Sequence, residues 1–203
     1  MVWIHNNPLP KVIVKRAVLL FLLIALFGLS GNLQARGWVS IGLPTIYKFS
    51  QSENDSFFPV SDMRGTPSGY MIYGSLYDIP FLGYESYTIA LDAENAEETA
   101  ANIKIVFYDI GVRFEQRNTH VLAGYGYGSV NTECELASCS GISFDEGIAR
   151  QLFIQLGVVL LGDLSFHLSA HRVTGQNDIS AGSSSDHFVI DGTLLAFGLK
   201  LNW

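Results

Sequence analysis

A short triplet, His167-Leu168-Ser169, carries the residue types of nucleophilic catalysis. A serine becomes a nucleophile when a nearby base accepts its proton, and that base needs an acid to orient it. Residues two positions apart on a β-strand share a face, so His167 and Ser169 can point the same way. No glutamate follows Ser169, and the orienting acid would have to be Asp178, Asp186 or Asp191. The triplet is therefore a weak candidate for an esterase centre.

The triplet lies within a larger set of polar residues that share the inward parity of their predicted strands. Charges enclosed in a protein interior must be paired, because the desolvation of each charge costs on the order of several kcal/mol. We therefore expect a packed network of salt bridges and hydrogen bonds, and the alternative is a narrow conducting path. The members of this predicted lumen network are Asp109, Arg113, Glu115, Gln151, Gln155, His167, Ser169, His171, Lys200 and Asn202.

Three cations have the opposite, outward parity near the end of their strands: Lys104, Arg150 and Arg172. Such side chains either extend to the headgroup level of a membrane or bind phosphate groups of lipopolysaccharide. Arg150 and Arg172 lie on neighbouring predicted strands, which favours a shared phosphate contact.

The two cysteines of the chain, Cys134 and Cys139, lie within one polar segment. In an exported protein this spacing predicts a disulfide that closes a small loop. Two thiols without a nearby histidine make a poor zinc site, so we predict no metal centre and no cofactor.

The polar segments between strands are strongly acidic. Their spacing matches no dedicated calcium loop, so a solvated surface is the better interpretation than a site for Ca²⁺ or Mg²⁺. The carboxylates are Glu53, Asp55, Asp62, Asp92, Glu94, Glu97, Glu98, Glu133, Glu135, Asp145, Glu146, Asp178 and Asp186.

Eight segments with alternating or β-rich sequence must position these groups. The connections between them are alternately long and short, as expected for a barrel with long loops outside the cell and short periplasmic turns. Pro44 interrupts the first segment and marks a candidate bulge, while Tyr84 and Glu85 leave the facing of the second and third segments open. The predicted strands are 37–48, with Val39, Ile41, Leu43 and Tyr47 on one face, and 68–79, 82–91, 103–115, 119–130, 148–161, 164–174 and 195–203.

Residues 1–35 are predicted to be a secretory signal peptide. Lys11, Lys15 and Arg16 precede an apolar run, 17–29, that is too short for a spanning helix, and Ala35 fits a cleavage position. An uncleaved anchor is the alternative. Removal of this segment leaves nine of the 12 basic residues against 19 acidic ones, a net charge of about −10 that excludes nucleic-acid binding.

No later segment is long and apolar enough for a membrane helix, so any span within 36–203 must be β. The last strand is apolar at every second position: Leu195, Phe197, Leu199, Leu201 and Trp203. Aromatic residues are expected in girdles at the membrane interfaces. We assign Trp38, Tyr47, Tyr73, Tyr77, Phe114, Tyr125, Tyr127 and Trp203 to these girdles.

This pattern resembles the small OmpA/OmpX-like outer-membrane barrels over 36–203. The resemblance implies an all-β, eight-stranded, antiparallel up-and-down transmembrane barrel, monomeric and located in the bacterial outer membrane. It also implies that Phe197, Leu199, Leu201 and Trp203 form the signal read by the outer-membrane barrel assembly machinery. Outer-membrane lipid and lipopolysaccharide are the other expected partners.

The His-x-Ser triplet separately resembles the pair of the outer-membrane lipid A deacylases. In that family the pair faces lipid, whereas here Phe166, Leu168 and Ala170 take the lipid-facing parity. We therefore predict a non-enzymatic barrel protein that serves envelope structure or surface interaction. The alternatives are a lipid A-modifying esterase and a narrow channel for small solutes.

Overall fold

The computed structural model describes residues 37–50, 64–76, 80–92, 99–134, 142–181 and 184–203. The predicted signal peptide and parts of the predicted acidic loops lie outside these ranges. No helix in the described part of the chain is long and apolar enough to cross a membrane. The strands are β1 (Trp38–Phe49), β2 (Arg64–Ser75), β3 (Phe81–Asp92), β4 (Thr99–Gln116), β5 (Thr119–Cys134), β6 (Ile142–Phe144), β7 (Gly147–Leu161), β8 (Leu164–Ala181), β9 (Ser184–Val189) and β10 (Gly192–Asn202).

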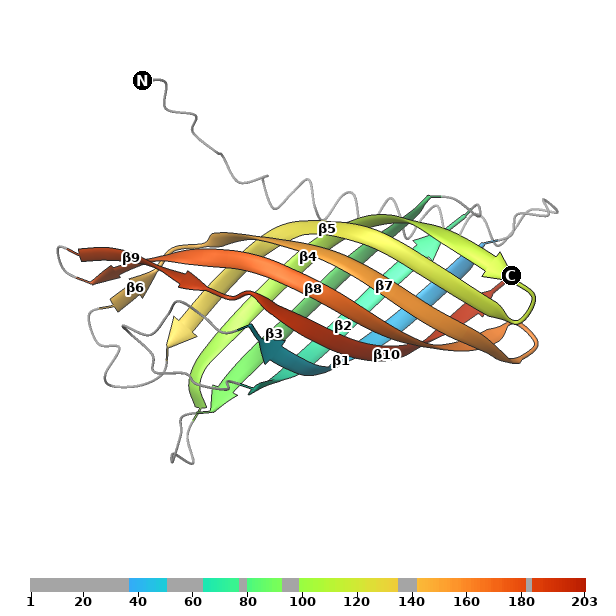
Figure 1. The fold of residues 1–203 in the computed structure, drawn as a ribbon, viewed down its shortest axis with the longest axis horizontal. Coiled ribbons are helices and arrows are strands. Elements are labelled where there is room, and N and C mark those ends of the chain that lie inside the picture. The colour runs from blue at the N-terminus through green and yellow to red at the C-terminus, as the bar shows by residue number, and fades with distance from the viewer. Residues whose placement is uncertain (1–36, 51–63, 77–79, 93–98, 135–141, 182–183) are drawn as a thin grey trace, which may run out of the picture. The chain divides into compact units, whose positions relative to one another are not determined.

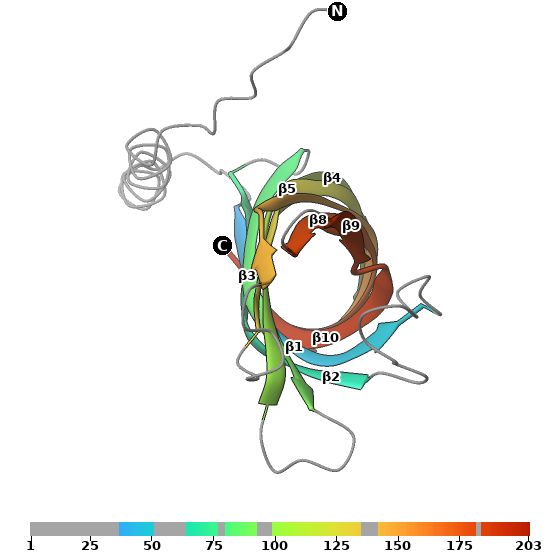
Figure 2. The same cartoon turned by 90° about the vertical axis from the view of Figure 1, so that its left-hand side faces the viewer.

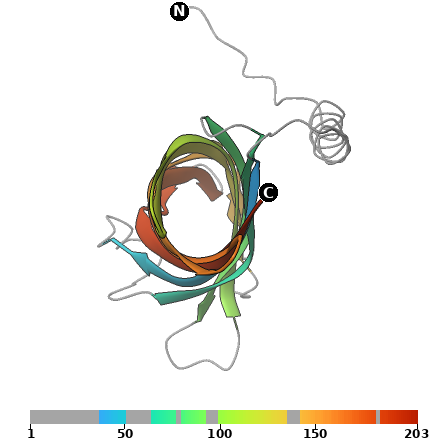
Figure 3. The same cartoon turned by 90° about the vertical axis from the view of Figure 1, so that its right-hand side faces the viewer.

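Eight of these strands close into an antiparallel barrel, which confirms the predicted fold. Neighbours follow the order β1, β2, β3, β4, β5, β7, β8 and β10, and β10 then pairs with β1. The ring of strands is seen from its two ends in Figures 2 and 3. Each of these eight described strands therefore has a hydrogen-bonded neighbour on both sides, which a barrel in lipid requires.

The first and last strands are joined up to the final residue. The amide of Gly37 donates to the carbonyl oxygen of Trp203 over 3.1 Å, and the amide of Trp203 donates to the oxygen of Gly37 over 3.0 Å. A Cβ atom at Gly37 would come within 2.5 Å of the Trp203 indole, so the ring lies directly over this glycine. The indole and the other apolar residues of the terminal strand face outward, as their spacing predicts.

A bulge in β1 reverses the facing of its C-terminal end. The register with β10 shifts between Pro44 and Ile46, where the sequence suggested a bulge. The shift turns Tyr47 into the barrel, where its side chain is fully buried. The prediction that Tyr47 shares the outward face of Ile41 and Leu43 is therefore wrong, because the extra residue changes the parity of the strand.

Two other girdle predictions are also wrong. Trp38 and Tyr73 are buried inside the barrel and not exposed at its surface. Tyr77 lies outside the described residues. The remaining girdle candidates, Phe114, Tyr125, Tyr127 and Trp203, are exposed on the outer surface.

The segment that follows the predicted strand 164–174 is largely β-structure. β8 continues to Ala181, and beyond the ends of β7 and β10 it pairs with β6 on one side and β9 on the other. Asn177 and Ile179 keep the inward parity of β8, which a prediction based on polar composition missed. This three-stranded extension, β6, β8 and β9, projects beyond the rest of the barrel wall (Figure 1).

The barrel wall has opposite polarity in its two halves. We call the end with the tight turns at 117–118 and 162–163 the lower half, and the end with β6 and β9 the upper half. On β4, the lower half places Ile110 outside and Asp109 inside, whereas the upper half places Lys104 outside and Ile105 inside. The lower half therefore resembles a membrane barrel, and the upper half resembles a water-soluble one.

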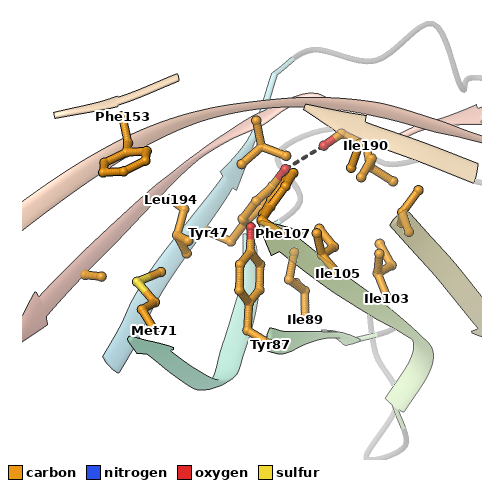
Figure 4. Close-up of a cluster of buried hydrophobic side chains, with 14 of the residues drawn as sticks. Tyr47, Met71, Tyr87, Ile89, Ile103, Ile105, Phe107, Phe153, Ile190 and Leu194 are labelled. Carbon is orange, nitrogen blue, oxygen red and sulfur yellow. Dashed lines mark hydrogen bonds between the residues drawn. The ribbon is translucent and has the colours of Figure 1, made fainter. Parts of the chain in front are cut away.

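The upper half contains a continuous hydrophobic core, part of which appears in Figure 4. Tyr47 crosses this core and donates a hydrogen bond from Oη to the carbonyl oxygen of Ile190, which follows β9. The buried apolar residues of this half include Met71, Tyr87, Ile89, Leu91, Ile103, Ile105, Phe107, Val130, Ile179, Phe188, Ile190 and Leu194.

Candidate functional site in the barrel interior

The middle of the lower half contains a buried hydrogen-bond network. Gln151 Nε2 donates to Asp109 Oδ1 over 2.8 Å, which directs Gln151 Oε1 toward His171 Nδ1 at 3.1 Å. We therefore place the proton of His171 on Nδ1, so that Nε2 accepts from the Ser169 hydroxyl at 2.9 Å. Glu85 joins the same network, because its Oε1 accepts from Tyr73 and lies 3.4 Å from His171 Nδ1.

A second polar group lies nearer the lower mouth. Arg113 contacts Glu115 and donates to Asn202 Oδ1 over 3.2 Å, while Lys200 Nζ lies 3.8 Å from Glu115 Oε1. The cations of Arg113 and Lys200 also lie 5.5 and 5.8 Å from the ring centroid of Trp38. The aromatic face of Trp38 and the Glu115 carboxylate help to compensate two closely placed positive charges.

Aromatic rings occupy the barrel axis between these two polar groups: on β7, Phe153 lies between Gln151 and Gln155, and on β3, Phe81 lies nearer the lower end than Glu85. Tyr73 on β2 and Phe153 on β7 are on opposite walls, yet their ring centroids are only 5.4 Å apart. Phe81 lies 6.0 Å from both rings, and His171 stacks on Phe153 at 5.0 Å. We call Tyr73, Phe81 and Phe153 the aromatic layer.

Glycines in the wall make room for the aromatic layer. A Cβ atom at Gly111 would approach the Phe81 ring to 2.5 Å, and one at Gly124 would approach the Phe153 ring to the same distance. These contacts are far shorter than van der Waals distance. The alternating glycines of the central strands therefore shape the interior, which an eight-stranded barrel fills with side chains.

Several buried polar atoms in the lower half have no hydrogen-bond partner among the described residues. They include both ring nitrogens of His120 and both amide atoms of Gln155. Buried groups of this kind normally bind another polar group or ordered water. The lower half therefore has the donors and acceptors to hold water, and in the upper core Tyr87 Oη is also without a partner among the described residues.

The structure places the predicted lumen residues inside the barrel. Asp109, Arg113, Gln151, Gln155, His171 and Lys200 are buried, and Glu115 lies at the lower mouth with 40% of its side chain exposed. Their assignment to a functional network stays a prediction.

Sequence reasoning missed five interior groups: Trp38, Ser40, Tyr73, Glu85 and His120. Glu85 and Tyr73 were missed because the facing of β2 and β3 was ambiguous. The signal that could have found them is the register between these strands, which places Glu85 opposite Met71 and inside with Tyr73.

The predicted pairing of His167 with Ser169 is not the one in the structure. His167 Nε2 lies 2.7 Å from Ser40 Oγ, and Ser169 binds His171 instead. The acid nearest His171 is Glu85, not Asp178, Asp186 or Asp191. The interior parity of Ser169 was predicted, but its partners come from other strands that the local spacing could not reveal.

The three predicted lipopolysaccharide contacts, Lys104, Arg150 and Arg172, are exposed on the outer wall where its polarity changes. Arg172 Nη1 donates to Ser50 Oγ over 2.7 Å. Lys104 lies apart from the other two, on β4, where its register neighbours are Thr88 and Asn131.

The predicted disulfide cannot be placed, since Cys139 lies outside the described residues and Cys134 ends β5. Among the described residues, no three potential ligands come together as a metal site.

No family model matches the chain, and no curated protein matches it. Among solved structures, the chain is similar to Neisserial surface protein A, with a TM-score of 0.56 and 9% identity, over 82% of this chain and 97% of that one. It is also similar to the outer membrane protein AlkL in DMPC lipid bilayers, with a TM-score of 0.50 and 9% identity, over 99% of this chain and 97% of the other. At this identity the likeness shows the fold alone, which is that of small eight-stranded outer-membrane barrels.

Proposed function

We propose that the protein is an integral barrel of the bacterial outer membrane that is closed to solutes and non-enzymatic. Its role is in envelope structure or in surface interaction through its upper end. The polarity of the lower wall supports membrane insertion, because residues such as Ile110, Leu152 and Leu168 are more than 45% exposed there. The hydrophobic core of the upper half supports a rigid extension beyond the membrane.

The observation that carries the closed interior is the contact of Tyr73 with Phe153 across the full diameter of the barrel. Phe81 packs against both rings, so a water column along the axis would have to pass through the aromatic layer. The apolar core above it adds a second barrier, because an ion in such a region would lose its hydration without gaining ligands.

Single-channel recording in planar bilayers tests this proposal. The unmodified protein should show no stable open conductance, whereas the double variant Tyr73→Ala with Phe153→Ala should show more frequent openings. Phe197→Ala is a matched control, since it removes a ring from the lipid-facing wall. A stable open state of the unmodified protein would support the alternative of a narrow solute channel.

The proposed location has its own test. The folded barrel should fractionate with the outer membrane and migrate differently on gels before and after boiling. We also propose that the barrel assembly machinery reads the terminal strand through Phe197, Leu199, Leu201 and Trp203. Trp203→Ala should then slow the appearance of the folded form in cells without changing refolding of the purified chain into detergent.

One observation favours a second candidate function, an esterase acting on lipid A. Ser169, His171 and Glu85 have the connectivity of a nucleophile, a base and an orienting acid. They are, however, 5% exposed or less, inside the closed barrel. Mass spectrometry of lipid A from expressing cells decides between the two: loss of an acyl chain that disappears with Ser169→Ala would support the esterase and contradict our proposal.

The predicted Cys134–Cys139 disulfide would order the segment between β5 and β6 at the upper end. We propose that this segment contributes to the surface that meets partners. Alkylation with and without reduction, followed by mass measurement, tests the bond: without it, both thiols would react before reduction.

A further inference from the structure

The basic residues on the outer wall, at the level where its polarity changes, are not spread evenly around the barrel. Lys48 on β1 is in register with Thr193 on β10, and Thr193 is in register with Arg172 on β8. Since neighbouring strands are about 4.8 Å apart, the backbones of Lys48 and Arg172 are about 10 Å apart. Long side chains at this separation can converge on one phosphate group or bind two adjacent ones.

Two further features orient this row. Arg172 donates to Ser50, which follows β1, so its guanidinium is directed across β10 toward the strand that carries Lys48. Arg150 lies on the next strand, β7. It is in register with Thr174, which is two residues beyond Arg172 on β8 toward the upper end. We call Lys48, Arg150, Arg172 and Thr193 the basic rim.

An apolar groove leads away from the basic rim. It has a volume of about 670 Å³ and crosses the outer wall from β4 to β10, ending at Arg172 and Thr193. Ala123 and Ala170 are short residues between larger neighbours such as Leu152 and Ile154, and this difference in size forms the depression. The strands of a small barrel are tilted by about 40°, so a groove across them runs obliquely into the bilayer.

We propose that the basic rim and this groove together form a binding site for a phosphorylated, acylated glycolipid, the lipid A part of lipopolysaccharide. The basic residues bind its phosphates by charge-assisted hydrogen bonds, and the groove holds an acyl chain. The basic rim lies near the end of the barrel that carries the long connections. In a barrel with this topology, that end lies in the outer leaflet of the membrane. The spread of cations over three strands suits a headgroup with more than one phosphate.

This inference rests on the proposed insertion into the outer membrane. It also sharpens the prediction from sequence, because it adds Lys48 to Arg150 and Arg172 and leaves Lys104 out. Lys104 lies on β4, outside the row of neighbouring strands β1, β10, β8 and β7, and its register neighbours are Thr88 and Asn131.

Native mass spectrometry of the detergent-extracted full chain tests the site, with bisphosphorylated lipid A as the probe. The double variant Lys48→Gln with Arg172→Gln should bind lipid A about tenfold more weakly, the loss of about one strong charged contact. Lys104→Gln is the matched control and should change binding by less than about twofold. Ala123→Leu with Ala170→Leu, which fills the groove and keeps every charge, should also weaken binding.

Four results would overturn the proposal. The double glutamine variant could bind as well as the unmodified protein, or Lys104→Gln could weaken binding to the same degree, which would indicate a diffuse charge effect. If phosphatidylglycerol bound as well as lipid A, and the double glutamine variant weakened the binding of both lipids equally, the site would be assigned to a phospholipid. A dimer that disappears when the groove is filled would identify this face as a contact between two copies. Heat-dependent gel mobility of each variant separates these outcomes from loss of the barrel, which would instead contradict the proposed function.

Discussion

Along β4 the inward residues change from Ile103 and Ile105 in the upper half to Asp109 and Arg113 in the lower half, while the outward residues change from Lys104 to Ile110. The same change occurs on β8, where His167 and Leu168 in the lower half give way to Val173 and Thr174 in the upper half. The surrounding medium explains both. A wall that meets lipid must be apolar outside and can be polar inside, whereas a wall that meets water needs a hydrophobic core. One strand can therefore belong to two kinds of barrel.

The largest effect should come from a charge placed inside the upper half. Ile105→Arg would bury an unpaired guanidinium in the apolar core, and we expect it to lower the free energy of unfolding by about 4 kcal/mol or more. Thr66→Arg adds the same side chain on the outside of the upper half and should change stability by less than about 0.5 kcal/mol. Urea unfolding in lipid vesicles measures both; equal tolerance of the two variants would contradict a hydrophobic core there.

The aromatic layer should be the next most sensitive region. Phe153→Ala removes a ring that contacts Tyr73, Phe81 and His171, and we expect a loss of about 3 kcal/mol. The same urea experiment measures this loss. Phe166→Ala, which removes a lipid-facing ring, serves as the control and should cost less. A similar loss for both would show that the aromatic layer is not specially packed.

Charge on the outside of the lower half tests the other side of the comparison. Ile110→Arg exposes a cation to the hydrocarbon, and we expect a cost of about 2 kcal/mol. The measurement is again urea unfolding in vesicles, repeated in detergent micelles, where the cost should shrink because the cation reaches water more easily. If Ile110→Arg were as harmless as Thr66→Arg in vesicles, this part of the wall would not face lipid.

The smallest effect concerns the link between the upper core and the extension. Tyr47→Phe removes the hydrogen bond to Ile190 but keeps the packed ring, so we expect a loss of about 1 kcal/mol. Hydrogen exchange should show faster opening near β9 and unchanged protection in β4. Tyr127→Phe, on the exposed outer wall, is the control. Unchanged exchange in β9 would mean that the hydrogen bond does not hold the extension.

Much of the lower half could be predicted from the sequence, because the alternation along a single strand shows which residues face the lumen and which face the lipid. The alternation of Asp109, Arg113 and Glu115 with Ile110, Val112 and Phe114 predicts both the lumen and the lipid face of β4. The upper half gave no such signal. There the inward residues are apolar and the outward ones polar, and a local pattern of this kind does not say which side is the inside.

The contacts of the candidate site could not be predicted for a related reason. His167 and Ser169 are neighbours in the sequence, but their hydrogen-bond partners Ser40 and His171 are set by the barrel register and by the direction of each ring. Tyr47 was misplaced because a single extra residue at the Pro44 bulge reverses the parity of everything that follows it on the strand.

The sequence by itself determined the number and direction of the eight barrel strands, the short turns, and the apolar outer face of the terminal strand, because each follows from local periodicity and turn chemistry. Only the tertiary structure decided that the interior is divided into a polar and an apolar half, that Tyr73 and Phe153 meet across the axis, and that Lys48 and Arg172 share one row. These features depend on which residues of different strands come into register when the barrel closes, and closure is a property of all eight strands together.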